Sequence, residues 1–340
     1  YSAKLIIPVT GPVIIDGAVA IHGDRVVHVG KRRWVLKALK QEMTAHGTIH
    51  ERHWDGVLTP GLINAHTHLQ YSGMVQVGQG TYDRFRAWEL AFNEVYAEAQ
   101  KTQPWKQWAE DGARQMVESG TTAAADIVTD LDAAGALASQ GMHGIAYWEV
   151  MGWHNAEWME KGRTELIRQL RRMNEEQLPN LGISPHAPYT LESEPFVDLP
   201  DIARQLNMRL HIHLAETPLE AGTYPPVLTT YSAADWSDHD WESYRQLKEV
   251  GKGASAIQFV DQLGSLGPDV HIAHGVWANG EDRRILRQRG VGVALCPRSN
   301  RITNTGKDAP VREYLEEGNL VSVGTDSLSS TPTLDLLDDV

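Results

Sequence analysis

The chain is poor in cysteine and has no excess of positive charge, and each shortage excludes a class of protein. Cys296 is the only cysteine among 340 residues, so no disulfide can form within the chain. Lys and Arg number 31 against 44 Asp and Glu, which gives a formal net charge of −13. This balance argues against nucleic acid, whose binding requires clustered basic residues, and against an anionic membrane surface.

Long apolar runs are also missing. No run approaches the ~20 residues that a membrane-spanning helix requires. The N-terminus lacks the basic and then apolar pattern of a signal segment. Together with the single cysteine, these absences favour the cytoplasm. The composition, 41% hydrophobic and 22% charged, is ordinary for a folded protein, and the length fits one barrel with a small appendage.

A short apolar run that ends in two histidines carries the first chemical signal. In Leu58-Thr-Pro-Gly-Leu-Ile-Asn-Ala-His66-Thr-His68, a Pro-Gly turn precedes a short, buried β-strand pattern. Side chains at i and i+2 of a strand point to the same side, so His66 and His68 can face one metal ion. The alternative for an isolated His-x-His is a pair of histidines that merely pack within a β-structure.

Three later apolar runs favour the metal site over that alternative. They end in His213, His274 and Asp326, and each run reads as a short strand. Function gathers at the C-terminal ends of the strands of a (β/α)8 barrel. We therefore expect these groups to meet His66 and His68 at one end of a barrel.

The rest of the chain alternates strand-like and helix-like patterns. We predict a small β unit over residues 1–57 and a TIM-type (β/α)8 barrel over residues 58–340. The expected barrel strands are 62–67, 121–127, 143–150, 180–185, 209–214, 269–273, 291–295 and 320–325. The expected helices are 83–100, 106–119, 132–140, 164–176, 194–207, 241–263, 280–289 and 310–317.

Several motifs together resemble one known family. They are Pro60-Gly-Leu-Ile-Asn-Ala-His66-Thr-His68-Leu, Ser119-Gly-Thr-Thr, Pro185-His186-Ala-Pro-Tyr, His213-Leu-Ala-Glu216-Thr, His274-Gly, Cys296-Pro-Arg-Ser-Asn300 and Gly324-Thr-Asp326-Ser. The chain resembles the amidohydrolase superfamily, in the branch of mononuclear-metal aminohydrolases. The resemblance implies that the N-terminal unit is half of a β-sandwich completed by C-terminal strands. The chain stops soon after the eighth expected strand, so its C-terminal end is truncated or this member closes differently.

The expected ligands of the metal are three imidazoles and one carboxylate. His66, His68 and His213 supply nitrogens and Asp326 supplies an oxygen. This ligand set suits Zn²⁺ first and Fe²⁺ second. Binuclear relatives use a lysine at the end of the fourth strand, whereas that strand ends here in His186. We therefore expect a single divalent ion.

The same residues predict hydrolysis. A metal ion lowers the pKa of a bound water toward ~7 and so provides hydroxide at neutral pH. Asp326 can orient this hydroxide and accept its proton, and His274 can polarise the attacked centre. Glu216 can protonate the ring nitrogen beside the attacked carbon and shuttle a proton to departing ammonia. The resemblance implies that His186 donates a hydrogen bond to the substrate ring.

Other substrate contacts are expected from the loops that follow the strands. Gln70 and Trp88 lie after the first strand, and Arg298 is the first cation to consider for a substrate carboxylate, with Arg84 or Arg86 behind it. The alternative for each of these side chains is that it packs in the fold or lies on the surface and does not contact the substrate. The long segment 217–240, after the strand that carries His213, is expected to be a lid or binding loop.

The leading functional hypothesis is metal-dependent deamination of an adenine nucleoside. We rank aminodeoxyfutalosine, an adenine nucleoside of a menaquinone pathway with a benzoate arm, first among substrates. The alternative is adenosine, S-adenosylhomocysteine or methylthioadenosine, followed by guanine or a chlorotriazine. A barrel that has lost its chemistry is the non-enzyme alternative, and it predicts missing ligands. The expected partner is a small molecule; homodimer formation is left open.

Overall fold

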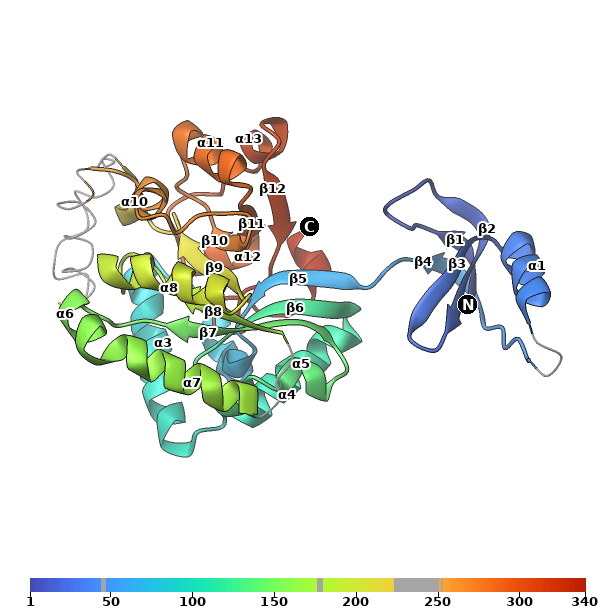
Figure 1. Cartoon of the computed structure of the whole chain (residues 1–340), viewed down its shortest axis with the longest axis horizontal. Helices are drawn as coiled ribbons and strands as arrows, with labels where there is room; N and C mark the ends of the chain where they lie inside the picture. Colours follow the sequence, from blue (N-terminus) through green and yellow to red (C-terminus); the bar gives the residue numbers. More distant parts are fainter. Residues whose placement is uncertain (44–46, 176–179, 223–250, 252) are drawn as a thin grey trace. The chain divides into compact units, whose positions relative to one another are not determined.

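The computed structural model describes the chain except for residues 44–46, 176–179, 223–250 and 252. It divides into two compact units, Tyr1–Gly61 and Leu62–Val340 (Figure 1). Each unit has its own sheet, so we describe the two separately.

The N-terminal unit is a four-stranded mixed sheet with one helix. Its strand order is β3 (Arg25–Lys31), β2 (Ile14–His22), β1 (Ser2–Ile6) and β4 (His53–Leu58). Strand β1 pairs antiparallel with β2 and parallel with β4. Helix α1 (Arg32–Glu42) packs on the sheet, where its Val35 is buried against two alanines of β2.

The second unit is an eight-stranded parallel barrel, as predicted. Its strands pair in chain order: β5 (Leu62–Thr67), β6 (Thr121–Val128), β7 (His143–Val150), β8 (Leu181–Pro185), β9 (Arg209–Leu214), β10 (Val270–His274), β11 (Gly292–Leu295) and β12 (Leu320–Val323). The predicted strands agree with these bounds within two residues at either end. Because every strand is parallel to the next, their C-terminal ends meet at one rim.

Helices connect the strands and cover the barrel. The longer ones are α3 (Phe85–Thr102), α4 (Trp105–Glu118), α7 (Arg163–Glu175), α8 (Ser193–Gln205), α10 (Ala256–Gln262), α11 (Gly280–Arg289), α12 (Pro297–Ile302) and α13 (Val311–Glu316). The helix predicted over 132–140 is instead a 3₁₀ turn (Leu131–Ala133) and the short α5 (Ala136–Ser139), which are separated by Gly135. Most of the N-terminal part of the predicted helix 241–263 lies outside the described residues.

The first and last strands of the barrel meet through an asparagine side chain. The side-chain N–H of Asn64 donates to Thr325 Oγ1 at 2.7 Å, and the Asn64 Oδ1 accepts from the Thr325 backbone N–H at 3.1 Å. Gly324 has no side chain, and a Cβ at this position would lie 2.8 Å from the His66 backbone nitrogen. This close approach allows the Asp326 backbone N–H to donate to the His66 carbonyl at 3.0 Å. Asp326 is thereby placed beside the first histidine.

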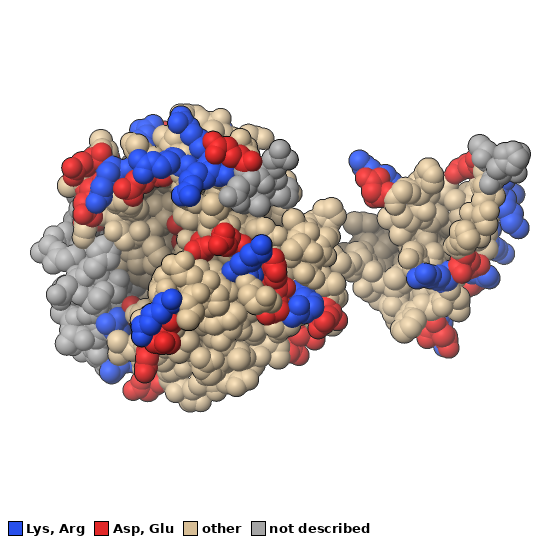
Figure 2. Space-filling model, turned by 90° about the horizontal axis from the view of Figure 1, so that it is seen from below, with Lys and Arg blue, Asp and Glu red and all other residues tan. Residues whose placement is uncertain are grey.

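Basic and acidic side chains are interspersed on the face drawn in Figure 2. Several such side chains pair in the structure, as Arg283 does with Glu317 at 2.7 Å. In the described part of the chain, no helix combines the length and apolarity needed to cross a membrane.

Candidate metal centre and active-site pocket

The two histidines of the first strand are buried at the C-terminal rim of the barrel. His66 lies near the end of β5 and His68 just after it, and both side chains face the barrel axis. Among the described residues, neither ring nitrogen of His66 has a hydrogen-bond partner, and Nδ1 of His68 also has none. A buried polar atom without a partner is costly, so these nitrogens call for a ligand.

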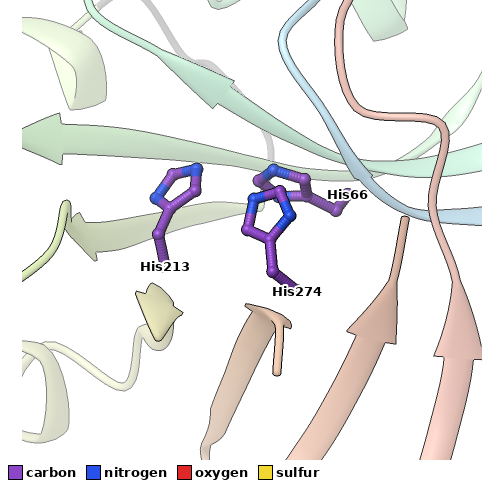
Figure 3. A group of neighbouring side chains, drawn as sticks. All are labelled: His66, His213 and His274. Atoms are coloured by element: carbon purple, nitrogen blue, oxygen red, sulfur yellow. The ribbon is translucent and has the colours of Figure 1, made fainter. Parts of the chain in front are cut away.

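His213 completes the cluster from β9. Its Nε2 lies 3.3 Å from Nε2 of His68, while its Nδ1 donates to the backbone carbonyl of His186 at 3.2 Å. The second bond fixes the ring orientation and leaves Nε2 for a metal ion, the usual arrangement for a ligating histidine. Figure 3 shows His66, His213 and His274 projecting from different strands into one space.

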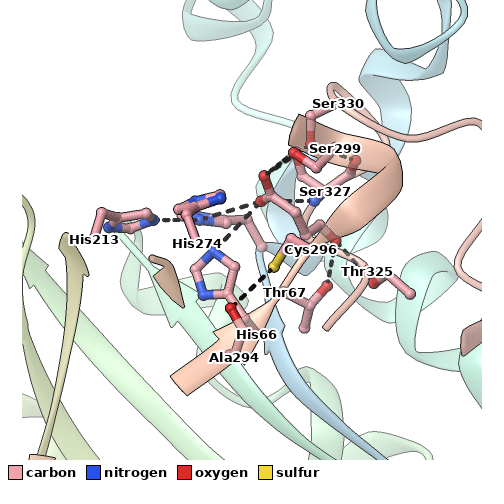
Figure 4. Close-up of polar contacts among 12 residues, drawn as sticks. His66, Thr67, His213, His274, Ala294, Cys296, Ser299, Thr325, Ser327 and Ser330 are labelled. Carbon is pink, nitrogen blue, oxygen red and sulfur yellow. Dashed lines mark hydrogen bonds and ion pairs between the residues drawn. The ribbon is translucent and has the colours of Figure 1, made fainter. Parts of the chain in front are cut away.

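Asp326 supplies the carboxylate. Its Oδ1 lies 3.6 Å from Nε2 of His66 and 3.7 Å from Nε2 of His68. The hydroxyls of Ser299 and Ser330 donate to its Oδ2 at 2.7 and 2.9 Å (Figure 4). These serines hold the carboxylate so that Oδ1 faces the histidines.

The donor set fits a divalent ion. Two groups of three residues could each hold an ion, because their ligand atoms lie within 4.8 Å of one another. One group is His66, His68 and Asp326, and the other is His66, His213 and His274. Burial lowers the pKa of His68 to about 4, and burial also lowers the pKa of His66 and His213. The rings are therefore neutral at physiological pH, as metal ligation requires.

Glu216 and His274, the two residues predicted for proton transfer and polarisation, lie side by side. Oε1 of Glu216 lies 3.4 Å from Nε2 of His274, and Oε2 accepts from the Tyr189 hydroxyl at 3.0 Å. On the other side of the ring, Nδ1 of His274 donates to Asn300 Oδ1 at 2.9 Å. Burial lowers the pKa of His274, but the nearby carboxylates of Glu216 and Asp326 outweigh that effect and raise it overall. Burial raises the pKa of Glu216.

A buried carboxylate holds the backbone that carries Glu216. Glu220 accepts hydrogen bonds from the backbone N–H groups of Ala215, Glu216 and Thr217 at 2.8–2.9 Å. Ala215, His274 and Asp326 all have positive φ angles, of 54°, 73° and 60°. Strained conformations of this kind persist at functional sites, where the surrounding structure enforces them. The strand ends are therefore bent to aim these side chains inward.

A cavity of about 190 Å³ opens over this cluster. Trp88, from α3, lines it and donates its indole N–H to the Ser329 carbonyl at 2.8 Å. His186 lines it from the end of the fourth barrel strand, and its Nδ1 lies 2.8 Å from the Thr190 hydroxyl. Both residues were predicted as substrate contacts; both line the cavity, and their contact with a substrate stays a prediction.

Glu149, at the end of β7, also lines the cavity. Its Oε1 lies 4.0 Å from Nε2 of His186 and 3.9 Å from Nδ1 of His213. This oxygen has no hydrogen-bond partner within the part of the chain that the structure describes. These three residues form a third metal-competent group. However, Nδ1 of His213 already donates to the His186 carbonyl, so it cannot also ligate a second ion. Burial raises the pKa of Glu149 to about 8.

Two predicted substrate contacts lie elsewhere. Gln70 is buried against Thr129: its amide donates to the Thr129 hydroxyl at 2.5 Å, and its Oε1 accepts from the Thr129 N–H at 2.9 Å. Arg298 bonds Asp339 Oδ2 through Nε and Nη2, at 2.9 and 2.7 Å, and Thr333 through Nη1. Neither side chain lines the cavity. Their positions do not support the predicted substrate roles, because local partners occupy their polar groups.

Arg84 and Arg86 also do not line the cavity, and no Lys or Arg is among the described residues that do. The expected lid, 217–240, is described only as far as residue 222. Its remainder lies outside the described residues.

Several functional neighbours were not predicted as such. Tyr189, Asn300 and Ser299 touch Glu216, His274 and Asp326 respectively. All three lie within the motifs Pro185-His186-Ala-Pro-Tyr and Cys296-Pro-Arg-Ser-Asn300. The sequence did hold a signal for these neighbours, because each is a polar residue within a motif that follows a barrel strand.

Known proteins are similar to this chain in sequence and in fold. The model of the amidohydrolase family matches residues 57–224 and 227–340. A 5-methylthioadenosine/S-adenosylhomocysteine deaminase of Moorella thermoacetica is 30% identical, over 98% of this chain and 70% of the relative. A 5'-deoxyadenosine deaminase of Methanopyrus kandleri is 30% identical, over 84% of this chain and 60% of the relative.

Solved structures agree in fold. The aminofutalosine deaminase of Helicobacter pylori, in complex with methylthio-coformycin, superposes with a TM-score of 0.74 at 20% identity, covering 99% of this chain and 79% of that one. The zinc-bound atrazine chlorohydrolase TrzN of Arthrobacter aurescens superposes with a TM-score of 0.76 at 20% identity, covering 99% and 73%. The family match covers most of the chain, and the barrel carries the metal-competent cluster at its rim. As its sequence motifs predict, the chain belongs to the amidohydrolase family.

Proposed function

We propose that the protein is a metal-dependent deaminase of adenine nucleosides that are modified at the 5' position. One observation carries the proposal. The buried carboxyl of Glu216 faces His274 at 3.4 Å at the floor of a cavity whose other wall is the metal-competent cluster. An acid-base group beside a metal centre is the combination that hydrolytic deamination of a nucleobase requires.

The metal centre is proposed to hold one divalent ion, with His66, His68, His213 and Asp326 as ligands. When bound, such an ion lowers the pKa of a coordinated water toward ~7. Zinc suits this set of nitrogen and oxygen donors. Asp326 is placed to accept the proton of the attacking water, since its Oδ1 faces the cluster while its Oδ2 is held by two serines.

Proton transfer to the ring is assigned to Glu216. Burial raises its pKa, so the carboxyl can carry a proton at a pH where an exposed one would have lost it. It gives this proton to the ring nitrogen beside the attacked carbon, where the proton stays. The hydroxyl group added to that carbon then gives its proton to the Glu216 carboxylate, which passes it to the amino group, and the C–N bond breaks to release ammonia. The water proton taken by Asp326 returns Glu216 to its protonated form.

His274 is held by Asn300 and is proposed to bind the attacking oxygen. His186 and Glu149 are proposed to hydrogen-bond the substrate.

The choice of substrate follows from the charge of the cavity. A buried carboxylate requires a cationic partner. No Lys or Arg lines the cavity in the described part of the chain, and Arg298 pairs with Asp339. This absence supports methylthioadenosine or 5'-deoxyadenosine over aminodeoxyfutalosine, which ranked first on the sequence. It gives no support to S-adenosylhomocysteine, whose arm also ends in a carboxylate. The names of the relatives from Moorella and Methanopyrus support the same choice.

A substrate panel tests the proposal. Zinc-loaded protein is incubated with 5'-deoxyadenosine, methylthioadenosine, adenosine, aminodeoxyfutalosine, guanine and a chlorotriazine, and ammonia or chloride release is measured. The highest kcat/KM is expected with 5'-deoxyadenosine or methylthioadenosine, above the value for aminodeoxyfutalosine. Preference for guanine or the triazine, or no turnover of any adenine nucleoside, would reject the proposed function.

A further inference from the structure

A second cavity of about 480 Å³ lies beside the active-site pocket. We call it the aromatic annex, because six aromatic side chains line it: Tyr71, Phe92, Tyr96, Trp148, Trp153 and Trp158. Tyr71, Phe92, Asn93, Glu149 and Met151 line both the annex and the pocket. The two cavities therefore meet at these side chains.

The rings of the annex hold one another in place. Phe92 packs edge-on against Tyr71, with ring centroids 5.1 Å apart, and stacks on Tyr96 at 5.7 Å. Across the cavity, Trp153 packs edge-on against Trp158 at 6.0 Å. The Trp158 indole N–H donates to Asp198 Oδ2 at 2.9 Å, so its polar edge is satisfied by protein. Such an arrangement is a preformed apolar site.

The charge of the annex restricts what it can bind. No Lys or Arg is among its described lining residues, whereas Glu149 and Glu165 both line it. Lys161 lies with its ammonium 5.8 Å from the centroid of the Trp153 ring, but it is not a lining residue. An anionic substituent of a ligand would have no cationic partner among these lining residues, so the free-energy cost of removing it from water would not be offset.

Size favours a ligand that uses both cavities. The pocket over the metal-competent cluster, at about 190 Å³, is smaller than the ~300–1,000 Å³ that is usual for small-molecule sites. The pocket and the annex together fall within that range. A nucleoside whose base lies over the cluster must direct its remote substituent elsewhere, and the annex is the neighbouring cavity, with five lining residues in common with the pocket.

We propose that the aromatic annex binds the 5' substituent of the substrate and selects one that is apolar and uncharged. This inference rests on the proposed function and refines it. Among 5'-modified adenosines, it ranks thioethers with alkyl or aryl groups above S-adenosylhomocysteine, whose arm ends in an ammonium and a carboxylate. Among these substrates, an aryl thioether should have the highest kcat/KM, because its ring can pack against the tryptophans.

A graded series of substrates tests this ranking. The values of kcat/KM are measured for 5'-deoxyadenosine, methylthioadenosine, 5'-phenylthio-5'-deoxyadenosine and S-adenosylhomocysteine with zinc-loaded protein. The phenylthio compound should exceed 5'-deoxyadenosine by at least ~10-fold, which is the scale of discrimination for a few added apolar atoms. Equal values along the series, or a preference for S-adenosylhomocysteine, would overturn the annex proposal while leaving the deaminase intact.

Two substitutions test whether the preference for the phenylthio compound arises in the annex. Trp153→Leu removes an aromatic wall, and Gln169→Trp adds a ring from α7 into the annex, whose wall Gln169 lines. Both should reduce the ratio of kcat/KM for the phenylthio compound to that for 5'-deoxyadenosine by ~10-fold or more. Trp34→Leu, at an exposed position of the N-terminal unit, is the control and should leave the ratio unchanged. An unchanged ratio in both annex variants would contradict the assignment.

A binding measurement separates this inference from the proposed function. If no nucleoside is deaminated, the proposed function fails, and the annex is tested by titrating the protein with the phenylthio compound while tryptophan fluorescence is followed. Saturable binding that Gln169→Trp weakens by ~10-fold would support the annex as an apolar binding site. Absence of binding would overturn it as well.

Discussion

The carboxyl of Glu216 and the imidazole of His274 lie 3.4 Å apart, and both are buried at the rim of the barrel. Each is held on its far side, Glu216 by the Tyr189 hydroxyl and His274 by Asn300. The pair is therefore fixed before any substrate enters. Pre-organisation of this kind lets acid-base groups act without paying for reorientation during the reaction.

Replacing Glu216 with Gln should abolish turnover and keep the metal. An amide has nearly the same shape but cannot carry the proton, and positioned acid-base groups contribute typically ~10²–10⁴-fold to the rate. The measurement is kcat together with metal content. The exposed Glu157→Gln is the matched control. A kcat near normal in Glu216→Gln would mean that another group transfers the proton.

Tyr189→Phe should lower kcat by ~10-fold or more while the metal stays bound. The phenol donates to Glu216 at 3.0 Å, and hydrogen bonds to charged groups are worth about 1.5–3 kcal/mol. Tyr82→Phe provides the control, because it also loses a tyrosine hydrogen bond, partly buried and to the Val77 carbonyl, without touching Glu216. Equal effects of the two substitutions would show that Tyr189 has only a general structural role.

His213→Ala should remove both metal and activity. The wild-type protein should bind one divalent ion per chain, whereas the variant loses a ligand whose Nε2 lies 3.3 Å from that of His68. Elemental analysis after dialysis measures the metal content. His143→Ala, at an exposed position of β7, should retain the ion. Two ions per site in an anomalous-scattering map would reject the single-metal assignment.

Asp126 should make stability depend on pH. Burial raises its pKa from 3.8 to about 8, although the Leu69 N–H donates to it at 2.9 Å. Because the folded state holds this proton more tightly than the unfolded state, the stabilisation is complete below the unfolded pKa and is lost as pH rises through about 8. Asp126→Asn cannot ionise, so it should gain stability relative to the parent by up to ~1.4 kcal/mol per pH unit between about pH 6 and about pH 8.

Urea unfolding of the two proteins at both ends of this pH range measures the difference. Both proteins should be free of metal, so that ligation does not contribute. A difference in unfolding free energy that does not change with pH would show that Asp126 titrates normally.

The sequence was sufficient for the barrel and the core of the site. Strand ends in a parallel barrel meet at one rim, so His66, His213, His274 and Asp326 could be brought together from the positions of the apolar runs alone. The i, i+2 spacing likewise placed His68 beside His66. These inferences depend on topology, which short hydrophobic runs encode directly.

Side-chain partners from distant parts of the chain could not be predicted in the same way. Arg298 was placed correctly after a barrel strand, but Asp339, which pairs with it, comes 41 residues later. Gln70 bonds Thr129, which follows the next strand. The aromatic annex also combines rings from three separate segments. No local pattern reveals which of several polar or aromatic side chains will turn toward a cavity.

Reaction of methylthioadenosine in ¹⁸O-labelled water tests hydrolytic deamination most directly. Zinc-loaded protein is mixed with the nucleoside, and the products are analysed by mass spectrometry and an ammonia assay. We predict one ammonia per turnover and one ¹⁸O atom on the purine carbon that carried the amino group, with the methylthio arm and the glycosidic bond intact. Release of free adenine, loss of the arm, or no labelled product from metal-loaded protein would contradict this prediction.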